Sequence, residues 1–248
     1  MFIDGEWFID INGNGVWDEG DMWAKLGNKG DLPVVGDWDG DGKDDIGIFG
    51  RAWAGDPRAI QRDPGLPHVF NKTRLAEKNL PPKEEDTVRT KRTMKVTMDG
   101  ALRADLIDHV FHYGVSGDRP VAGDWTGNGV DCIGVFKDGD WHLDSDGDGR
   151  FTSRDERFQF GMVGDLPAVG DWDNDGIDNI GVYRNGKWIL DSNGNRQIDD
   201  ADQVVELGAA KDMPIVGDWR GDGRDRIGLY HEGTIERAAS TDTPIIQR

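Results

Sequence analysis

The stretch Pro167-Ala-Val-Gly-Asp-Trp172 decides the fold, because close copies of it occur three more times in the chain. The copies are Pro33-Val-Val-Gly-Asp-Trp38, Pro120-Val-Ala-Gly-Asp-Trp125 and Pro214-Ile-Val-Gly-Asp-Trp219, and the four tryptophans are 87, 47 and 47 residues apart. A Gly/Asp-rich loop and then an Ile-Gly strand follow each copy, at 46–49, 133–136, 180–183 and 227–230. A fixed period of this length is typical of a repeat architecture.

Two further series recur in phase with the first. One is Gly5-Glu-Trp7, Gly139-Asp-Trp141 and Gly186-Lys-Trp188, and the other is Phe111-His-Tyr-Gly114 and Phe158-Gln-Phe-Gly161. The unit therefore has four short strands, which predicts an all-β fold, a β-propeller of four-stranded blades. A solenoid would need capping units at both ends, and none is evident.

We expect four blades, closed by the N-terminal strands. Strands near residues 6–10 and 22–27 would complete the blade begun by residues 214–230. Residues 233–237 are a competing strand or the start of another blade, since they lie where the next Trp strand would begin, although they lack the tryptophan.

The whole chain, 1–248, is expected to form one propeller domain. Its repeats span about 5–50, 51–137, 138–184 and 185–231, and 232–248 is a degenerate strand and tail. The first interval of 87 residues places an insertion of about 40 residues at about 54–103. Residues 51–103 hold 12 Lys/Arg and 7 Asp/Glu, so this segment is basic on an acidic body. It is either a solvated loop or a partner-binding loop.

Composition excludes several classes of protein. The 248 residues carry a net charge of −19, which repels nucleic-acid phosphates, and no apolar run approaches the roughly 18 residues of a membrane span. The start lacks the basic and apolar regions of a secretory signal, as in a mature form, a fragment or a cytosolic protein. The single cysteine, Cys132, excludes an internal disulfide and a cysteine-based zinc site, and we interpret it as structural.

The loops after the repeated tryptophans, here called the Asp-Trp loops, carry oxygen ligands at positions 1, 3 and 5. Gly at position 6 allows a sharp turn and a later carboxylate can complete the shell, which is how Ca²⁺ is held. The first and third loops are the most acidic, the second has less charge, and the fourth has Arg220 at position 3, so its site is empty or bridged internally. Position 8 is always Asp, whereas position 9 is Asp45, Cys132, Asn179 or Arg226, and the sequence leaves open which position closes each site. The candidate ligands are Asp37, Asp39, Asp41, Asp44 and Asp45; Asp124, Asn128 and Asp131; and Asp171, Asp173, Asp175 and Asp178.

A second class, the twelve-residue loops at 10–21, 144–155 and 191–202, follows the other Trp strand. Acidic or amide groups at positions 1, 3, 5 and 12 match the spacing of an EF-hand or dockerin loop, without flanking helices. Arg196 replaces the expected Gly in the third, and the Asn-rich loops should bind Ca²⁺ more weakly. Alternatively, both classes are ordinary turns whose Asp side chains cap backbone amides. The candidate ligands are Asp10, Asn12, Asn14, Asp18 and Asp21; Asp144, Asp146, Asp148 and Asp155; and Asp191, Asn193, Asn195 and Asp202.

The strand-loop-strand units resemble FG-GAP/VCBS repeats, the calcium-loop repeats of integrin α-subunit propellers and many bacterial surface proteins. The resemblance implies a Ca²⁺-stabilised, monomeric, extracellular or cell-surface module for interaction or adhesion, with a protein or glycan partner. It differs from the integrin pattern, where position 9 is the closing Asp.

An enzyme is the weakest of the alternatives. His109 and His112 lie outside any HExxH pattern, and no nucleophile, phosphate or dinucleotide motif is present, so we expect no catalytic residue. Integrin-like propellers occur in some polysaccharide lyases, and a localised His/Tyr/Arg cluster would have favoured that class. A lectin-like propeller is the other alternative, and Trp17 and Trp23, which lie off the repeated positions, are its candidates for sugar stacking.

Overall fold

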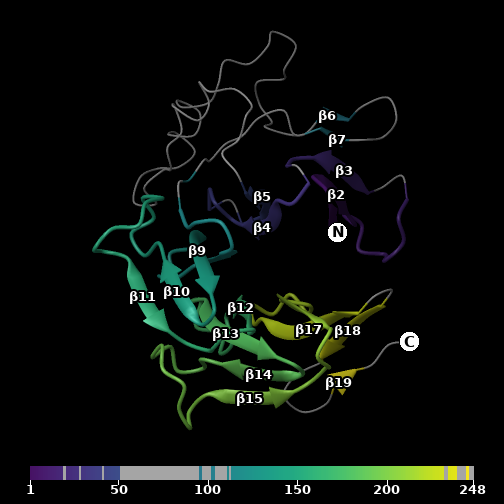
Figure 1. Cartoon of the computed structure of the whole chain (residues 1–248). Helices are drawn as coiled ribbons and strands as arrows, with labels where there is room; N and C mark the ends of the chain where they lie inside the picture. The colour runs from purple at the N-terminus through teal and green to yellow at the C-terminus, as the bar shows by residue number, and fades with distance from the viewer. Residues whose placement is uncertain are drawn as a thin grey trace.

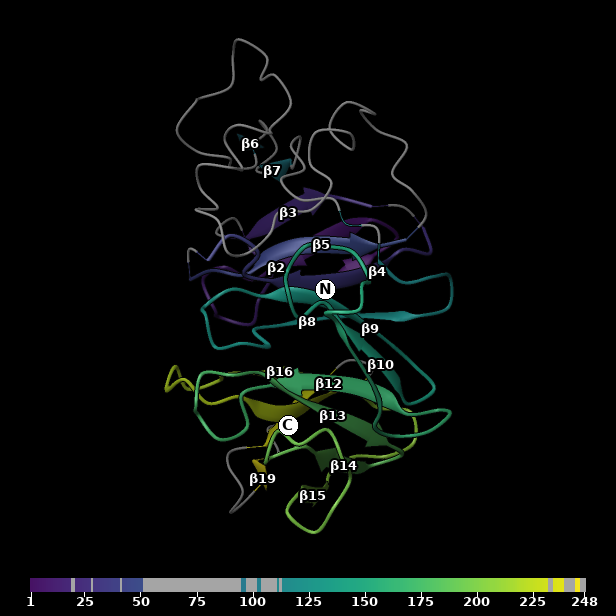
Figure 2. The ribbon, with the colours of Figure 1, turned by 90° about the vertical axis from the view of Figure 1, so that its left-hand side faces the viewer.

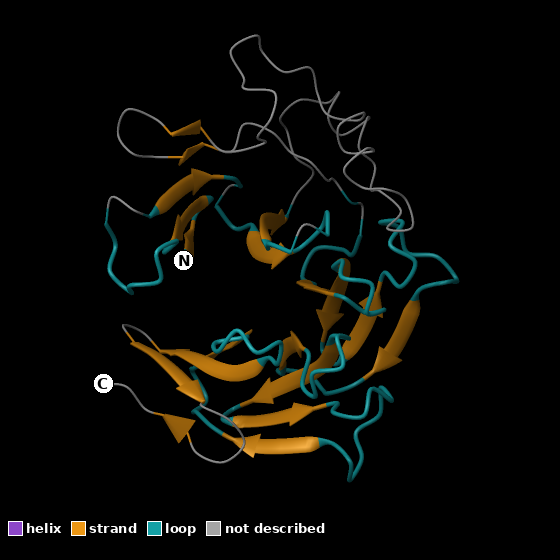
Figure 3. Ribbon diagram, turned by 180° about the vertical axis from the view of Figure 1, so that it is seen from behind, coloured by secondary structure: helices purple, strands orange, loops and turns teal. Residues whose placement is uncertain are grey.

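The computed structural model describes residues 1–18, 21–27, 29–40, 42–50, 95–96, 102–103, 111, 113–231, 234–238 and 244–245. Every element in these ranges is a β-strand or a turn (Figure 3). This confirms the expected all-β class. Nearly all of the predicted insertion at 54–103 lies outside the described residues.

Three four-stranded antiparallel sheets follow one another along the chain. The first is formed by β8 (Arg119–Gly123), β9 (Cys132–Lys137), β10 (Asp140–Leu143) and β11 (Glu156–Gln159). The second is formed by β12 (Leu166–Gly170), β13 (Asn179–Arg184), β14 (Lys187–Leu190) and β15 (Gln203–Glu206). The last is formed by β16 (Met213–Gly217), β17 (Arg226–His231), β18 (Thr234–Ala238) and β19 (Pro244–Ile245).

Smaller sheets come from the first part of the chain. Strands β1 (Phe2–Ile3), β2 (Glu6–Ile9) and β3 (Met22–Lys25) form one sheet, β4 (Leu32–Gly36) pairs with β5 (Asp45–Phe49), and β6 (Lys95–Val96) pairs with β7 (Leu102–Arg103). The strands that precede the Asp-Trp loops lie side by side in the order β4, β8, β12, β16. The sheets thus form an arc, with β1–β3 at one end and β16–β19 at the other (Figure 1). From the side, β2–β5 lie above β8–β10, and β12–β15 lie below (Figure 2).

The expected closure by the N-terminal strands is wrong for the described residues. β17 pairs with β18, whereas β2 pairs with β1 and β3. Residues 234–238 follow β17 after only two residues, so they reach its edge with a far smaller loss of chain entropy than strands more than 200 residues away. The competing strand considered at 233–237 is therefore the third strand of the last sheet.

Tight hairpins join the second and third strands. Asp138 and Gly139 have φ angles of 54° and 89°, and Asn185 and Gly186 have 50° and 95°. Two successive positive φ angles are typical of the type I′ turn, which Asx-Gly pairs favour and which matches the twist of the strands. These hairpins set the register that aligns Phe136 with Trp141 across the first full sheet.

Aromatic residues fill the space between consecutive sheets. Phe136 and Trp141 pack with Ile180 and Val182 of the next sheet, and Tyr183 and Trp188 pack in the same way with Ile227 and Leu229. Each repeated tryptophan of this series also donates its indole N–H to a backbone carbonyl 19 residues later, as Trp7 does to Leu26, Trp141 to Phe160 and Trp188 to Leu207. These tryptophans are therefore structural.

Candidate metal centres in the two loop classes

The first carboxylate of each Asp-Trp loop organises the loop around itself. Asp171 accepts hydrogen bonds from the backbone N–H groups of Asn174 and Asp175 with Oδ1, and from that of Gly176 with Oδ2 at 2.8 Å. Asp37, Asp124 and Asp218 accept the matching bonds from their own loops. This is the turn-capping role that Asp takes in loops. It gives the loop its curvature.

The third Asp-Trp loop brings three carboxylates to one point. Oxygens of Asp171, Asp173 and Asp175 all lie within 4.8 Å of one another. Asp171 is buried, whereas Asp173 and Asp175 are exposed. In the first loop, Asp41 lies outside the described residues, while Asp37 and Asp39 are half-buried. The second loop has Thr126 at position 3, whose hydroxyl donates to Asp124.

Position 8 has a role that sequence reasoning missed. Asp178 accepts a 2.8 Å hydrogen bond from the backbone N–H of Asp124, and its own N–H donates to the Asp124 carbonyl at 2.9 Å. The same pair of bonds joins Asp131 to Asp37 and Asp225 to Asp171. Position 8 therefore fastens each loop to position 1 of the loop before it. We call this reciprocal pair the inter-repeat clamp.

In the first three repeats, the glycine before the Asp-Trp pair makes room for the clamp. A Cβ atom on Gly123 would lie 2.9 Å from Asp178 Oδ2, and one on Gly170 would lie 2.8 Å from the Cβ of Asp225. No side chain fits between the strand end and the incoming carboxylate. The recurring Gly-Asp-Trp and the Asp always found at position 8 are thus two halves of one contact, and their joint recurrence was the available sequence signal.

Burial makes the clamp carboxyls weak acids. It raises the pKa of Asp178 to about 7 and that of Asp131 to about 6, and neighbouring carboxylates add to the rise. Burial also raises the pKa of Asp225, and the charge of Asp44 contributes to it. Position 8 of the first and last repeats thus interact electrostatically. Within the described residues, no hydrogen bond joins Asp44 to Asp218, the pair that would make a fourth clamp.

Position 9 differs between repeats. Cys132 is buried, as expected of a structural cysteine, and Asp45 is exposed. The side-chain oxygen Oδ1 of Asn179 accepts a hydrogen bond from Arg196 of the following twelve-residue loop. In the fourth loop, the side chain at position 9 returns to its own loop: Arg226 pairs with Asp218 and Asp222. The internal bridge expected there includes Arg226, whose hydrogen bonds lower the pKa of Asp222, and the charge of Arg220 adds to that effect.

The twelve-residue loop 144–155 carries the second acidic triad. Oxygens of Asp144, Asp146 and Asp148 lie within 4.8 Å of one another, and Asp144 is almost fully buried. Burial raises the pKa of Asp144 to about 7, with further increases from Asp155 and the other two carboxylates. Asp155, at position 12, accepts hydrogen bonds from the N–H groups of Ser145 and Thr152, which ties the end of the loop to its start.

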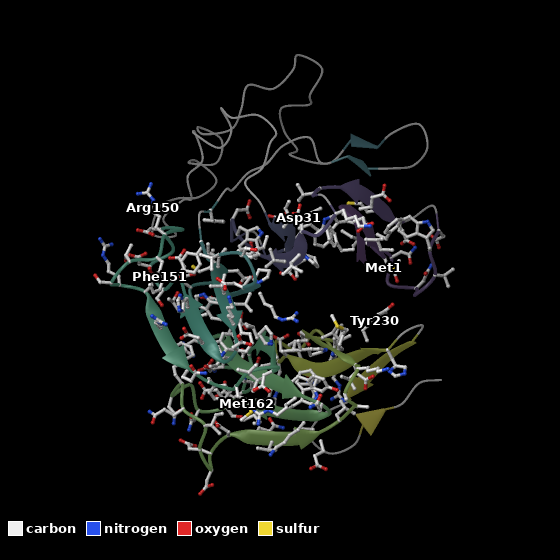
Figure 4. All side chains as sticks on the ribbon, in the orientation of Figure 1. Met1, Asp31, Arg150, Phe151, Met162 and Tyr230 are labelled. Carbon is white, nitrogen blue, oxygen red and sulfur yellow. The ribbon has the colours of Figure 1, made fainter. Side chains whose placement is uncertain are left out.

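Aromatic side chains cover this loop. Phe151 stacks on His142 at 4.8 Å and meets the edge of Tyr113 at 6.0 Å, and Figure 4 places it at the outer side of the β8–β11 sheet. The charges of the loop carboxylates, after burial itself, raise the pKa of the Tyr113 phenol. Sequence analysis assigned Tyr113 only a strand position, and nothing in the spacing pointed to this contact.

The other two twelve-residue loops satisfy part of their charge internally. Asn14 donates to Asp18, and Asn195 donates to Asp199, both at 2.7 Å. Asn12 and Asn193 donate to the same two carboxylates. Arg196 has a φ of 63° and points away from its loop, toward Glu156 at 3.0 Å. Its backbone thus adopts the turn that Gly supplies elsewhere.

Each twelve-residue loop also holds a buried carboxylate oxygen without a hydrogen-bond partner in the described structure. These atoms are Asp21 Oδ1, Asp146 Oδ1 and Asp202 Oδ1, at loop positions 12, 3 and 12. A buried carboxylate oxygen that lacks a donor carries a large desolvation penalty. A cation in the loop would supply the missing partner, and hard oxygen ligands of this kind fit Ca²⁺. The residues present therefore fit the ion.

The remaining described features limit other kinds of site. His142 contacts Asp140 at 3.3 Å, and His231 contacts Asp212, so both imidazoles are paired with carboxylates. His109 and His112 lie outside the described residues. Trp17 is 54% exposed and touches Phe8 edge to face at 5.4 Å, while the side chain of Trp23 is not described.

No helix in the described ranges has the length and apolarity to cross a membrane. Searches of protein-family models, curated proteins and solved structures find no match to this chain.

Proposed function

We propose that this protein is a calcium-binding β-propeller of the FG-GAP/VCBS type that serves as a non-enzymatic interaction or adhesion module outside the cell or at its surface. The observation that carries the calcium proposal is the unpartnered carboxylate oxygen buried in each of the three twelve-residue loops. The two acidic triads add support. Each is an arrangement of hard oxygen ligands with the loop curvature that Ca²⁺ sites use.

The propeller is supported by the way the sheets repeat. Strands β4, β8, β12 and β16 lie in series, two interfaces between sheets use the same aromatic positions, and three clamps link the Asp-Trp loops. We infer that these strands are the inner strands of four blades. Tyr230 occupies the place of Phe136 and Tyr183 but is 42% exposed, since no described sheet covers it. Figure 4 shows it on the side of the last sheet that faces Met1 and the N-terminal sheet.

The sites are ranked by charge and by internal pairing. Loops 144–155 and 171–179 present three carboxylates each and should bind most tightly. Loops 10–21 and 191–202 present amides that already donate to Asp18 and Asp199, so they should need more Ca²⁺. Millimolar calcium, as found outside cells, fills such weak sites. This ranking supports the extracellular assignment.

Ion counting on two variants tests the site assignment. Asp146→Ala and Asp173→Ala each remove one carboxylate of a triad and are expected to lower the number of bound Ca²⁺ ions by one per chain, measured by equilibrium dialysis. Asp138→Ala removes a carboxylate from a hairpin outside both loop classes and should leave the count unchanged. Equal counts in all four proteins would refute the assignment.

Glycan binding is the second candidate, favoured by the exposure of Trp17 within loop 10–21. An exposed indole can stack on a sugar ring. Binding to immobilised glycans should then be selective, and Trp17→Ala should weaken it at least about tenfold, a loss of about 1.4 kcal/mol. Trp188→Phe is the control, because it replaces a tryptophan that lies inside the core. Glycan binding that survives Trp17→Ala would exclude this side chain, and no binding at all would favour a protein partner.

A further inference from the structure

The fourth Asp-Trp loop, residues 218–226, contains a guanidinium where the third loop gathers three carboxylates. The Arg226 Nη1 and Nη2 nitrogens lie 2.9 Å and 2.7 Å from the two carboxylate oxygens of Asp222. Nη1 also lies 3.4 Å from Asp218 Oδ1 and 2.8 Å from the carbonyl oxygen of Arg224. The arginine side chain is only 10% exposed. It is therefore held within the loop.

The partners of this guanidinium are the groups that a calcium loop offers to its ion. Asp218 is position 1, Asp222 is position 5 and the Arg224 carbonyl is at position 7. Calcium loops of this spacing take ligands from side chains at positions 1 and 5 and from the backbone carbonyl at position 7. A bidentate Arg-carboxylate pair fixes such geometry well because the guanidinium is planar. The Arg226 guanidinium thus contacts the groups that would otherwise bind a Ca²⁺ ion.

The third Asp-Trp loop of the same chain has no positive group at position 9. Its positions 1, 3 and 5 are Asp171, Asp173 and Asp175, and Asn179 at position 9 brings no charge. In the fourth loop, the positive group at position 9 lowers the pKa of Asp222 to about 2, whereas burial and the neighbouring carboxylates raise that of Asp144 in loop 144–155 to about 7. Arg226 thus offsets the charge of the carboxylates at positions 1 and 5 of the fourth loop.

We propose that Arg226 is the built-in cation of the fourth Asp-Trp loop, so that this loop keeps its folded form without a metal ion and does not admit Ca²⁺. The inference rests on the proposed function, since it takes the other loops as calcium sites. It follows that calcium removal loosens loops 144–155 and 171–179 and leaves loop 218–226 folded.

Arg226→Asp tests the proposal, because it exchanges the guanidinium for a carboxylate at position 9, as Asp45 has in the first loop. Arg224→Asp is the matched control: it makes the same charge change two residues away, on a side chain for which no pairing is found in the described structure. Equilibrium dialysis at millimolar Ca²⁺ should give one more bound ion for Arg226→Asp than for the wild type or for Arg224→Asp. An unchanged count, with ions bound elsewhere in the wild type, overturns the proposal.

A second measurement needs no variant. Amide hydrogen exchange in the wild-type protein should show the Gly221 and Gly223 amides, which donate to Asp218, equally protected in EDTA and in Ca²⁺. The Gly149 and Gly176 amides should gain at least about tenfold protection with Ca²⁺. Calcium-dependent protection at Gly221 and Gly223 overturns the built-in cation. No change at Gly149 and Gly176 counts instead against the proposed function.

When no ion binds to the wild type, thermal unfolding in EDTA still decides the role of Arg226. Arg226→Asp should then melt several degrees below Arg224→Asp, since it removes the guanidinium that pairs with Asp218 and Asp222 and places a carboxylate beside them. Equal melting temperatures would overturn the proposal independently of calcium.

Discussion

Asp178→Ala is expected to lower the free energy of unfolding by about 2–3 kcal/mol, in EDTA and in Ca²⁺ alike. The variant removes the acceptor of the Asp124 N–H in the inter-repeat clamp, and hydrogen bonds to charged groups contribute about 1.5–3 kcal/mol. It also opens space beside Gly123, where the carboxylate now packs. Urea unfolding at pH 8, followed by tryptophan fluorescence, measures the loss.

Asp173→Ala is the matched comparison in the same loop. Asp173 is exposed and no hydrogen bond to its carboxylate is found in the described structure, so in EDTA the variant should unfold within about 0.5 kcal/mol of the wild type. In Ca²⁺ it should lose the stability that the ion adds. A calcium-dependent loss for Asp178→Ala, with little effect in EDTA, would instead make position 8 a metal ligand.

Without calcium, the protein is expected to lose stability as the pH rises from about 5 to 8, by on the order of 3 kcal/mol. Burial raises the pKa of Asp144 and Asp178 to about 7 and that of Asp131 to about 6, from 3.8. The folded state therefore binds more protons than the unfolded chain in this range. The stability that this proton binding adds is fully present below the pKa of the unfolded chain. It is lost as the pH rises through the pKa values of the folded state.

Urea unfolding in EDTA at pH 5, 6.5 and 8 measures this slope. Asp144→Asn should flatten it, because the amide keeps an acceptor for Gly149 and does not titrate. Asp222, whose pKa is lowered to about 2, stays ionised throughout the range and should not contribute. Calcium should reverse the trend, since protons compete with the ion for Asp144. A stability that rises with pH in EDTA would contradict the burial of these carboxyls.

Most strands could be predicted from the sequence because the same pattern of residues recurs four times. The 47-residue spacing and the recurring segments placed the strands of the first two full sheets, but of the last sheet only β16 and β17, since the N-terminal strands were expected to complete it. The strand beside β17 was predicted wrongly, because it is β18 and not an N-terminal strand. Pairing of β17 with residues 234–238 depends on chain entropy rather than on pattern, and those residues lack the tryptophan that marked the other third strands.

Loop spacing predicted which carboxylates gather but not what each one contacts. Positions 8 and 9 are adjacent, and only the three-dimensional arrangement shows that Asp131, Asp178 and Asp225 reach back to the preceding loop. Arg220 and Arg226 are both positive residues of the fourth loop, and the path of the chain decides that Arg226 lies over Asp222. Contacts between residues of different repeats leave no pattern within a short stretch of sequence, so they could not be predicted from the spacing of residues in one loop.

The central claim is that calcium fills the acidic loops and stabilises the folded chain. The most direct test is calorimetric unfolding of the wild-type protein in EDTA and across a Ca²⁺ titration, with bound calcium counted by elemental analysis. We expect at least two ions per chain, one for each acidic triad, and a melting temperature that rises with Ca²⁺ concentration. No bound ion and an unchanged melting temperature would contradict the claim and make these loops Asp-capped turns.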